Sequence, residues 1–289
     1  MRDDILRHLG NHWLNADSLS HTLTYSILPK TLTSRSDLDY IVSTESLGDT
    51  KELFFRNIAD ESKKRDLIRS GWCTDENNLK PILYRANSRG FRCDHFTDEP
   101  SLVFFGCSFT YGTGMHEDDI WPTRVSKHFD LKCCNLGIPA QNLGPSSLYT
   151  TLLMQDDIPN AKAFIIKKQA FDRITFFMEG VNAPGEYYSW NIGHYIQRVL
   201  SINDTNKQFY NQLVRSVQPT SEVMDFKDLS LIISYAEKHN IPIIFADNSE
   251  DKNFNKPGEY VARDYGHPGM EWHDFMTSAT IKQLESILS

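Results

Sequence analysis

Ser101–Phe105 (SLVFF) and Gly106–Gly112 (GCSFTYG) form one continuous stretch, and this stretch decides the fold. The apolar residues after Ser101 are typical of a strand that is buried on both faces of a sheet. The glycine and serine that follow favour an abrupt turn into a helix. We therefore expect Ser108 at the carboxyl end of a central strand, the edge at which parallel sheets bind their ligands. Taken alone, the stretch is equally compatible with a glycine-serine turn that carries no chemistry.

Short apolar segments alternate with helical segments on the carboxyl side of this stretch. The candidate strands are 131–135, 163–166 and 241–246, and the candidate helices are 120–129, 226–239 and 273–288. Strands that alternate with helices predict a parallel sheet covered on both faces. We therefore expect an α/β fold, a three-layer α/β/α sandwich of the flavodoxin-like kind, over residues 99–289.

Two segments fall outside this alternation. Residues 1–98 are polar and mixed, and they predict a partly helical N-terminal extension packed on the main domain, ending in an extended arm over 84–96 with a turn at 88–90. Residues 178–223 are rich in Tyr, Asn, Trp and Gly and are longer than a crossover needs. A substrate-facing lid and a helical surface excursion both remain open for that segment.

Composition limits the class of partner. Of the 289 residues, 40% are hydrophobic and 24% are charged, which is ordinary for a globular protein. The formal net charge of -8 argues against a nucleic-acid partner, because phosphate binding needs a basic surface. The sequence has neither a signal-peptide core nor an apolar run of the ~20 residues that a membrane span requires. We expect a cytoplasmic protein without a membrane partner, and the oligomeric state stays open.

The cysteines predict neither disulfides nor a metal site. The chain has five cysteines and no C-x-x-C pair, which favours reduced thiols. Cys133 and Cys134 are adjacent in a predicted strand and would point to opposite faces of the sheet.

A second motif, Ala262–Gly269 (ARDYGHPG), precedes the last predicted helix. Asp264 and His267 are three residues apart, so the carboxylate can hold one imidazole nitrogen and fix the tautomer of the ring. The alternative is that Asp264 caps a turn and that His267 is a surface histidine.

Together, the early G-x-S turn and the late D-x-x-H-P resemble two sequence blocks of the SGNH (GDSL-like) hydrolase superfamily. The resemblance covers about residues 101–289 and implies that Ser108 is the nucleophile, His267 the general base and Asp264 its orienting acid. It also implies an oxyanion hole formed by the backbone amides of Ser108 and of Gly137, the glycine of the N-L-G-I-P run at 135–139. The arm followed by G-C-S-F is also similar to phage-encoded SGNH-like proteins.

The sequence departs from the family pattern at two positions. Cys107 replaces the aspartate of G-D-S, and its use as an alternative nucleophile is the less favoured interpretation because buried thiols are usually inert. The asparagine that the family places after the third strand is also missing. Gln169 is the nearest carboxamide and is our candidate for the third oxyanion donor, with Lys168 and Arg173 as other possible donors. Asn142 and Tyr111 are candidate substrate-binding residues, although Asn142 also suits a simple turn.

Other motifs are weaker. Thr110 occupies the last glycine position of an α/β-hydrolase elbow, no G-K-[ST] follows for a P-loop, and a dinucleotide fingerprint lacks its third glycine. The acidic cluster at 116–119 suits a polar helix start better than a metal site. The aromatic candidates for a sugar-binding wall, for which ordinary packing is the other interpretation, are Trp121, Trp190 and Trp272.

We therefore expect a serine esterase that removes a small acyl group, such as an O-acetyl from a carbohydrate or the acyl group of a simple lipid-like ester, without metal or other cofactor. The alternative is a non-catalytic module with the same fold that binds carbohydrate or has a structural role in a virion.

Overall fold

The computed structural model describes residues 41–42, 84–85, 87, 89, 91–138, 142–167, 177–179, 187–189, 204–246, 262 and 267–288. The strands are β1 (Ile41–Val42), β2 (Tyr84–Arg85), β3 (Ser101–Phe105), β4 (Lys132–Asn135), β5 (Ala161–Ile166), β6 (Phe177–Glu179), β7 (Tyr187–Ser189) and β8 (Ile243–Phe245). The helices are α5 (Ser108–Tyr111), the 3-10 helix η3 (Glu117–Asp119), α6 (Trp121–His128), α7 (Gly144–Leu152), α8 (Met154–Asp157), α10 (Asp204–Lys238) and α11 (Met270–Leu288).

The central sheet has four parallel strands in the order β4-β3-β5-β8. Val103 of β3 lies opposite Cys134 of β4 on one side and Phe164 of β5 on the other. All five residues of β3 are buried, as the apolar run predicts. The predicted strands are confirmed, and so is the parallel sheet.

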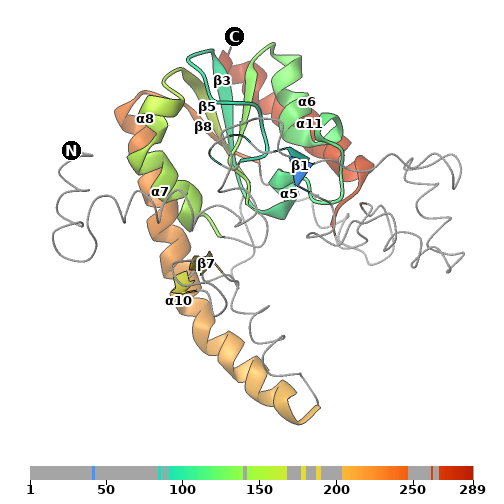
Figure 1. The fold of residues 1–289 in the computed structure, drawn as a ribbon, viewed down its shortest axis with the longest axis vertical. Coiled ribbons are helices and arrows are strands. Elements are labelled where there is room, and N and C mark those ends of the chain that lie inside the picture. Colours follow the sequence, from blue (N-terminus) through green and yellow to red (C-terminus); the bar gives the residue numbers. More distant parts are fainter. Residues whose placement is uncertain are drawn as a thin grey trace, which may run out of the picture.

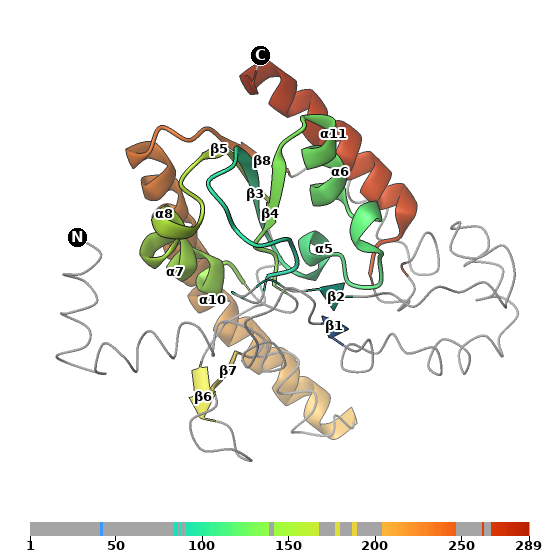
Figure 2. The same ribbon diagram turned by 45° about the horizontal axis from the view of Figure 1, so that its top comes forward.

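Helices cover both faces of this sheet (Figure 1 and Figure 2). Helices α7, α8 and α10 pack on one face, and α6 and α11 pack on the other. Alternate residues of β3 enter the two cores, Val103 and Phe105 on the first face and Leu102 and Phe104 on the second. The predicted three-layer α/β/α sandwich is therefore confirmed.

Two expectations about side chains are settled by this packing. Cys133 and Cys134 enter opposite cores, as predicted, and the described cysteines are free. Trp121 and Trp272 are 0% and 1% exposed, and Trp121 packs edge-on against Phe104 with ring centroids 5.2 Å apart. These two tryptophans cannot form a sugar-binding wall, so the packing interpretation holds for them, while Trp190 lies outside the described residues.

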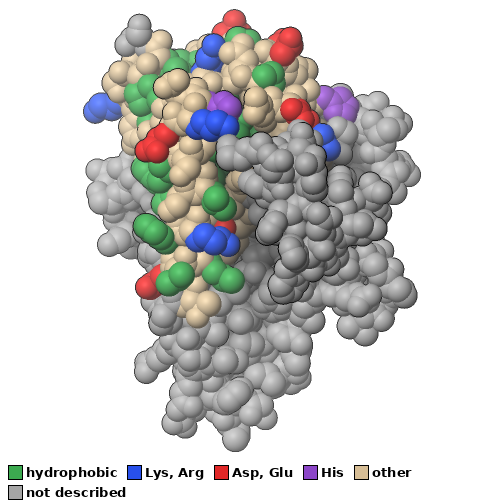
Figure 3. All heavy atoms as spheres, turned by 90° about the vertical axis from the view of Figure 1, so that its left-hand side faces the viewer, with side chains coloured by type: hydrophobic (Ala, Val, Ile, Leu, Met, Phe, Trp, Pro, Cys, Tyr) green, Lys and Arg blue, Asp and Glu red, His purple; other side chains and the backbone are tan. Residues whose placement is uncertain are grey.

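Helix α10 is much longer than the predicted helix over 226–239, because it begins at Asp204. The helical interpretation is therefore confirmed for the second half of the 178–223 segment. The helix runs beyond the sheet on the side where α5 lies (Figure 1). Val223 and Phe226 are 69% and 73% exposed, and hydrophobic side chains are visible along α10 in Figure 3. Within the described part of the chain, no helix combines the length and apolar character that a bilayer requires.

The described end of the predicted arm packs into the sandwich. Phe91 and Cys93 are 1% and 5% exposed and belong to the core beneath α7 and α10. The side-chain oxygen of Asn87 accepts hydrogen bonds from the amides of Arg89 and Phe91, which closes a turn at the predicted place. The structure thus makes this part of the arm a buried component of the domain.

Candidate active site

Ser108 is the first residue of α5, a four-residue helix that starts just after β3. Gly106 allows this abrupt turn, because a Cβ at that position would lie 2.0 Å from Oγ1 of Thr110. Ser108 itself is 4% exposed, and its carbonyl accepts the amides of Gly112 and Thr113. The predicted position of Ser108, at the carboxyl end of the central strand, is what the structure shows.

The sheet order places α5 at a topological switch point. From β3 the chain crosses to β4 on one side and then to β5 on the other. Ligands of open α/β sheets bind outside the carboxyl ends of the strands where this reversal occurs. Ser108 follows one of the two strands at the switch point, so topology alone marks its surroundings as the candidate site.

Lys167 follows the other strand at this point and was missed by the sequence analysis. It is 7% exposed, its amide donates to the carbonyl of Phe105 at 2.9 Å, and its Cβ lies beside Gly106. Its position directly after an apolar strand was the available signal. The donors predicted after this strand were instead Gln169, Lys168 and Arg173, and Lys168 lies outside the described residues.

His267 lies beside the serine turn. Its ring contacts the ring of Phe109, the residue after Ser108, with centroids 5.8 Å apart and planes at 78°. The carbonyl of His267 accepts the amide of Ala262 at 2.7 Å. Asp264 lies outside the described residues, so the triad as a whole stays a prediction.

Gly137 also adjoins α5. A Cβ on Gly137 would lie 2.6 Å from the amide nitrogen of Tyr111, so only glycine fits this approach. The amide of Gly137 donates to Oδ1 of Asn135 at 3.0 Å, and Nδ2 of Asn135 donates to the carbonyl of Thr110 at 2.9 Å. The amide of Gly137, the predicted oxyanion donor, is therefore adjacent to the turn. In this structure it donates to Asn135 instead. The role of Asn135 was not predicted from the sequence.

The two predicted substrate-binding residues are both buried. Asn142 is 2% exposed, and its Oδ1 accepts the amide of Gly144 at 3.0 Å, in the way of a turn residue. Tyr111 is 5% exposed, and the guanidinium of Arg92 lies 5.3 Å from the centroid of its ring. Burial raises the pKa of Tyr111 to about 12. Neither presents a broad surface to a substrate, and Gln169 and Arg173 lie outside the described residues.

Two alternative chemistries receive no support from the described residues. Cys107 is 5% exposed and occupies the position before α5 in an extended conformation, with no side-chain cap. The acidic segment near His116 forms η3, and its Asp118 pairs with Lys127 at 2.7 Å. No group of three or more His, Cys, Asp or Glu side chains in the described part of the chain is placed to hold a metal ion.

Fold and site together define the class of molecule, an α/β sandwich that presents a serine at its topological switch point. No family model matches the chain, and no curated protein matches it. Among solved structures, a lipolytic protein of the G-D-S-L family from Veillonella parvula is 15% identical, over 63% of this chain and 96% of that one, with a TM-score of 0.31.

Two carbohydrate esterases give similar values. A carbohydrate acetylesterase family member from Sinorhizobium meliloti is 10% identical over 65% of this chain and 99% of that one, with a TM-score of 0.32. An acetyl xylan esterase from Butyrivibrio proteoclasticus is 13% identical over 65% of this chain and 64% of that one, with a TM-score of 0.34. Nothing about the activity of this chain follows from likeness at this level.

Proposed function

We propose that the chain is a serine hydrolase that cleaves a small ester, with Ser108 as nucleophile, His267 as general base and Asp264 as the group that orients His267. The observation that carries the proposal is the contact of the His267 ring with Phe109. This contact brings two segments far apart in the sequence together at the switch point of the sheet. A serine beside a histidine at such an edge has the parts that acyl transfer needs.

The reaction proceeds in two halves. Oγ of Ser108 attacks the acyl carbonyl carbon while His267 takes the hydroxyl proton, and the tetrahedral intermediate then expels the alcohol, which receives that proton. Water attacks the acyl-enzyme with His267 again as base, which releases the acid and restores the serine. The amides of Ser108 and Gly137 stabilise the oxyanion, and Gln169 remains the candidate third donor.

The burial of Ser108 favours a short acyl group as the proposed substrate. Ser108 is 4% exposed, which favours an acetyl group, on a carbohydrate or another alcohol, over a bulky acyl chain. The Gly137 amide reaches an oxyanion only if it releases Oδ1 of Asn135.

The test is labelling of the protein with a fluorophosphonate probe, together with p-nitrophenyl acetate hydrolysis. We expect the wild type to be labelled at Ser108 and Ser108→Ala to lose both labelling and turnover while it remains folded. Ser278→Ala removes an exposed serine of α11 and is the matched control, with labelling unchanged. Undiminished turnover in Ser108→Ala would remove Ser108 from its role.

One observation favours a second candidate, a non-catalytic module that binds carbohydrate or serves as a structural part of a virion. The Gly137 amide is already bound to Asn135, as in a site that no longer needs it for an oxyanion. This candidate predicts no labelling of the wild type at any pH between about 6 and 9, because only an activated serine reacts with the probe. Labelling of Ser108 would eliminate it.

A further inference from the structure

Arg92 reaches the turn that carries Ser108 from the arm that precedes β3. Its side chain is 1% exposed. Its Nη1 donates to the carbonyl oxygens of Tyr111, at 3.0 Å, and Gly112, at 2.6 Å. Its Nη2 donates to the carbonyl oxygen of Met115 at 2.7 Å. One buried guanidinium thus binds the chain at three points directly after the candidate nucleophile.

These bonds satisfy groups that α5 cannot satisfy by itself. The last carbonyls of any helix lack intrahelical partners, and α5 is only four residues long. Backbone amides bind the carbonyl of Ser108, and Asn135 binds that of Thr110. Arg92 binds the carbonyl of Tyr111 and shares that of Gly112 with the amide of Met115. Because buried carbonyls without partners are costly, these bonds favour a single conformation of the turn.

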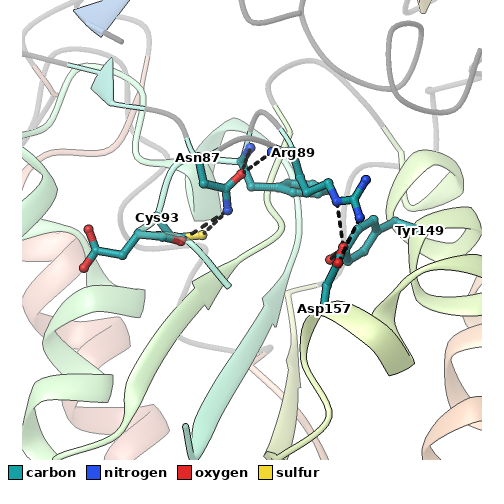
Figure 4. A network of polar contacts seen from close by, with 7 residues as sticks. Asn87, Arg89, Cys93, Tyr149 and Asp157 are labelled. Atoms are coloured by element: carbon teal, nitrogen blue, oxygen red, sulfur yellow. Dashed lines mark hydrogen bonds and ion pairs between the residues drawn. The ribbon is translucent and has the colours of Figure 1, made fainter. Parts of the chain in front are cut away.

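The arm makes a second attachment to the sandwich, through Arg89, which is separate from the bonds of Arg92 (Figure 4). Nε and Nη2 of Arg89 bind the two carboxylate oxygens of Asp157 in α8, at 2.8 and 2.9 Å. The side chain of Asn87 binds the amides of Arg89 and Phe91 at 3.0 and 3.1 Å. Arg89 therefore anchors the arm to one side of the sandwich, and Arg92, three residues later, reaches the serine turn.

We propose that Arg92 is a positioning residue of the nucleophile turn, which holds Ser108 in the orientation required for attack on the acyl carbon. The inference rests on the proposed function of Ser108. Arg92 acts through the backbone of residues 111–115 and does not touch the reacting atoms. Its loss therefore lowers kcat and leaves KM nearly unchanged, because the substrate makes no contact with it.

The experiment compares three variants with the wild type, well below the melting temperature of each. Arg92→Met removes the donors and keeps the length of the side chain, and Arg92→Lys retains the charge and part of the donor capacity. Arg89→Met is the matched control, since it removes an arginine of the same arm that does not contact the turn. The readouts are kcat and KM for p-nitrophenyl acetate and the rate of fluorophosphonate labelling.

We expect kcat and the labelling rate to fall roughly 10- to 100-fold in Arg92→Met, with KM within about twofold of the wild type. The kcat and labelling rate of Arg92→Lys should lie between those of the wild type and Arg92→Met. If Arg92→Met does not fold, Arg92→Lys is compared with the wild type in its place. Arg89→Met keeps kcat within about twofold, although it also loses stability.

Hydrogen exchange gives a readout that needs no activity. The amides of Gly112 and Thr113, which donate to the Ser108 carbonyl, exchange faster in Arg92→Met and not in Arg89→Met.

Two results in an active wild type overturn the proposal, namely an unchanged kcat in Arg92→Met or an equal loss of kcat in Arg89→Met. A wild type that neither hydrolyses the ester nor accepts the probe overturns the proposed function instead, and with it the catalytic meaning of Arg92. In that case the exchange data still show whether Arg92 fixes the turn, so the two failures are distinguishable.

Discussion

The backbone amide of Trp121 donates a hydrogen bond of 3.1 Å to Nδ1 of His273, and this bond joins the first turn of α6 to the first turn of α11. His273 is 1% exposed. Burial lowers the pKa of His273 to about 3, and the nearby charges of Arg124, Arg92 and His267 act in the same direction. A ring that accepts at Nδ1 is neutral and carries its proton on Nε2. Protonation at Nδ1 would break the bond.

The hydrogen bond between Trp121 and His273 predicts that the protein loses stability in mild acid. The unfolded chain binds a proton at this histidine below its ordinary pKa of about 6.5, whereas the folded protein resists protonation down to about 3. Because the unfolded state binds more protons in this window, the free energy of unfolding decreases as the pH falls from about 6.5 towards 3. We expect one group to contribute a slope of up to about 1.4 kcal/mol per pH unit.

His273→Asn is the matched variant, because the Oδ1 of asparagine can accept from the Trp121 amide without titrating. Urea unfolding between about pH 4 and 7 should show a shallower slope in the variant, by up to about 1.4 kcal/mol per pH unit. Identical slopes in the two proteins would rule out His273 as a source of the acid sensitivity.

Asp157→Asn should destabilise the protein, because it weakens the attachment of Arg89 in the arm to α8. Its carboxylate accepts two hydrogen bonds from Arg89 and one from the hydroxyl of Tyr149 at 2.9 Å, and its side chain is 15% exposed. Loss of this charge-assisted network should lower the free energy of unfolding by about 2 kcal/mol.

Asp118→Asn provides the control for that measurement. Its ion pair with Lys127 joins side chains that are 84% and 62% exposed, so its loss should cost no more than about 0.5 kcal/mol. Equal losses in Asp157→Asn and Asp118→Asn in urea unfolding would contradict the anchoring role of the arm.

Gly106→Ala should lower stability by about 1–3 kcal/mol, because the added Cβ would lie 2.0 Å from Oγ1 and 2.8 Å from Cβ of the buried Thr110. Thr110→Ala removes the nearer of these two atoms. The double variant should therefore be more stable than the sum of the single losses predicts, in a double-mutant cycle measured by urea unfolding. Additive losses of stability would show that the Cβ added at position 106 does not clash with the side chain of Thr110.

Asn135→Ala should leave two buried backbone groups without their partners, the carbonyl of Thr110 and the amide of Gly137. We expect a loss of about 2–4 kcal/mol in the free energy of unfolding and faster hydrogen exchange at the Gly137 amide. Asn160→Ala, which removes one exposed bond to the carbonyl of Asp98, should change stability by no more than about 0.5 kcal/mol. Unchanged protection of Gly137 in Asn135→Ala would refute this account.

The layers of the fold could be predicted because they depend on local patterns. The apolar run Ser101–Phe105 is buried along its whole length, and the alternation that follows it gives the parallel sheet. The position of Ser108 then follows from the end of that strand. For α10, the mixed polar composition before residue 226 concealed a helix that begins at Asp204.

The residues that hold the backbone of the candidate site in place, Arg92 and Asn135, could not be predicted in the same way. Arg92 stands in a polar run without periodicity, and its acceptors are carbonyls of the main chain, which carry no sequence signal. Asn135 belongs to a quoted motif, but its bond to Thr110 forms only when β4 and α5 are brought together. Such long-range contacts arise from tertiary packing, and hydrophobic patterns do not report them.

The burial of the arm bears on any shortened version of this protein. A polypeptide begun at residue 99, where the repeating strands and helices start, would lack Phe91, Arg92 and Cys93, which are each at most 5% exposed. Water would then reach the ring of Tyr149, on which Phe91 packs with centroids 5.0 Å apart, and the carbonyls that Arg92 binds. Expression of a minimal domain therefore has to begin ahead of Asn87.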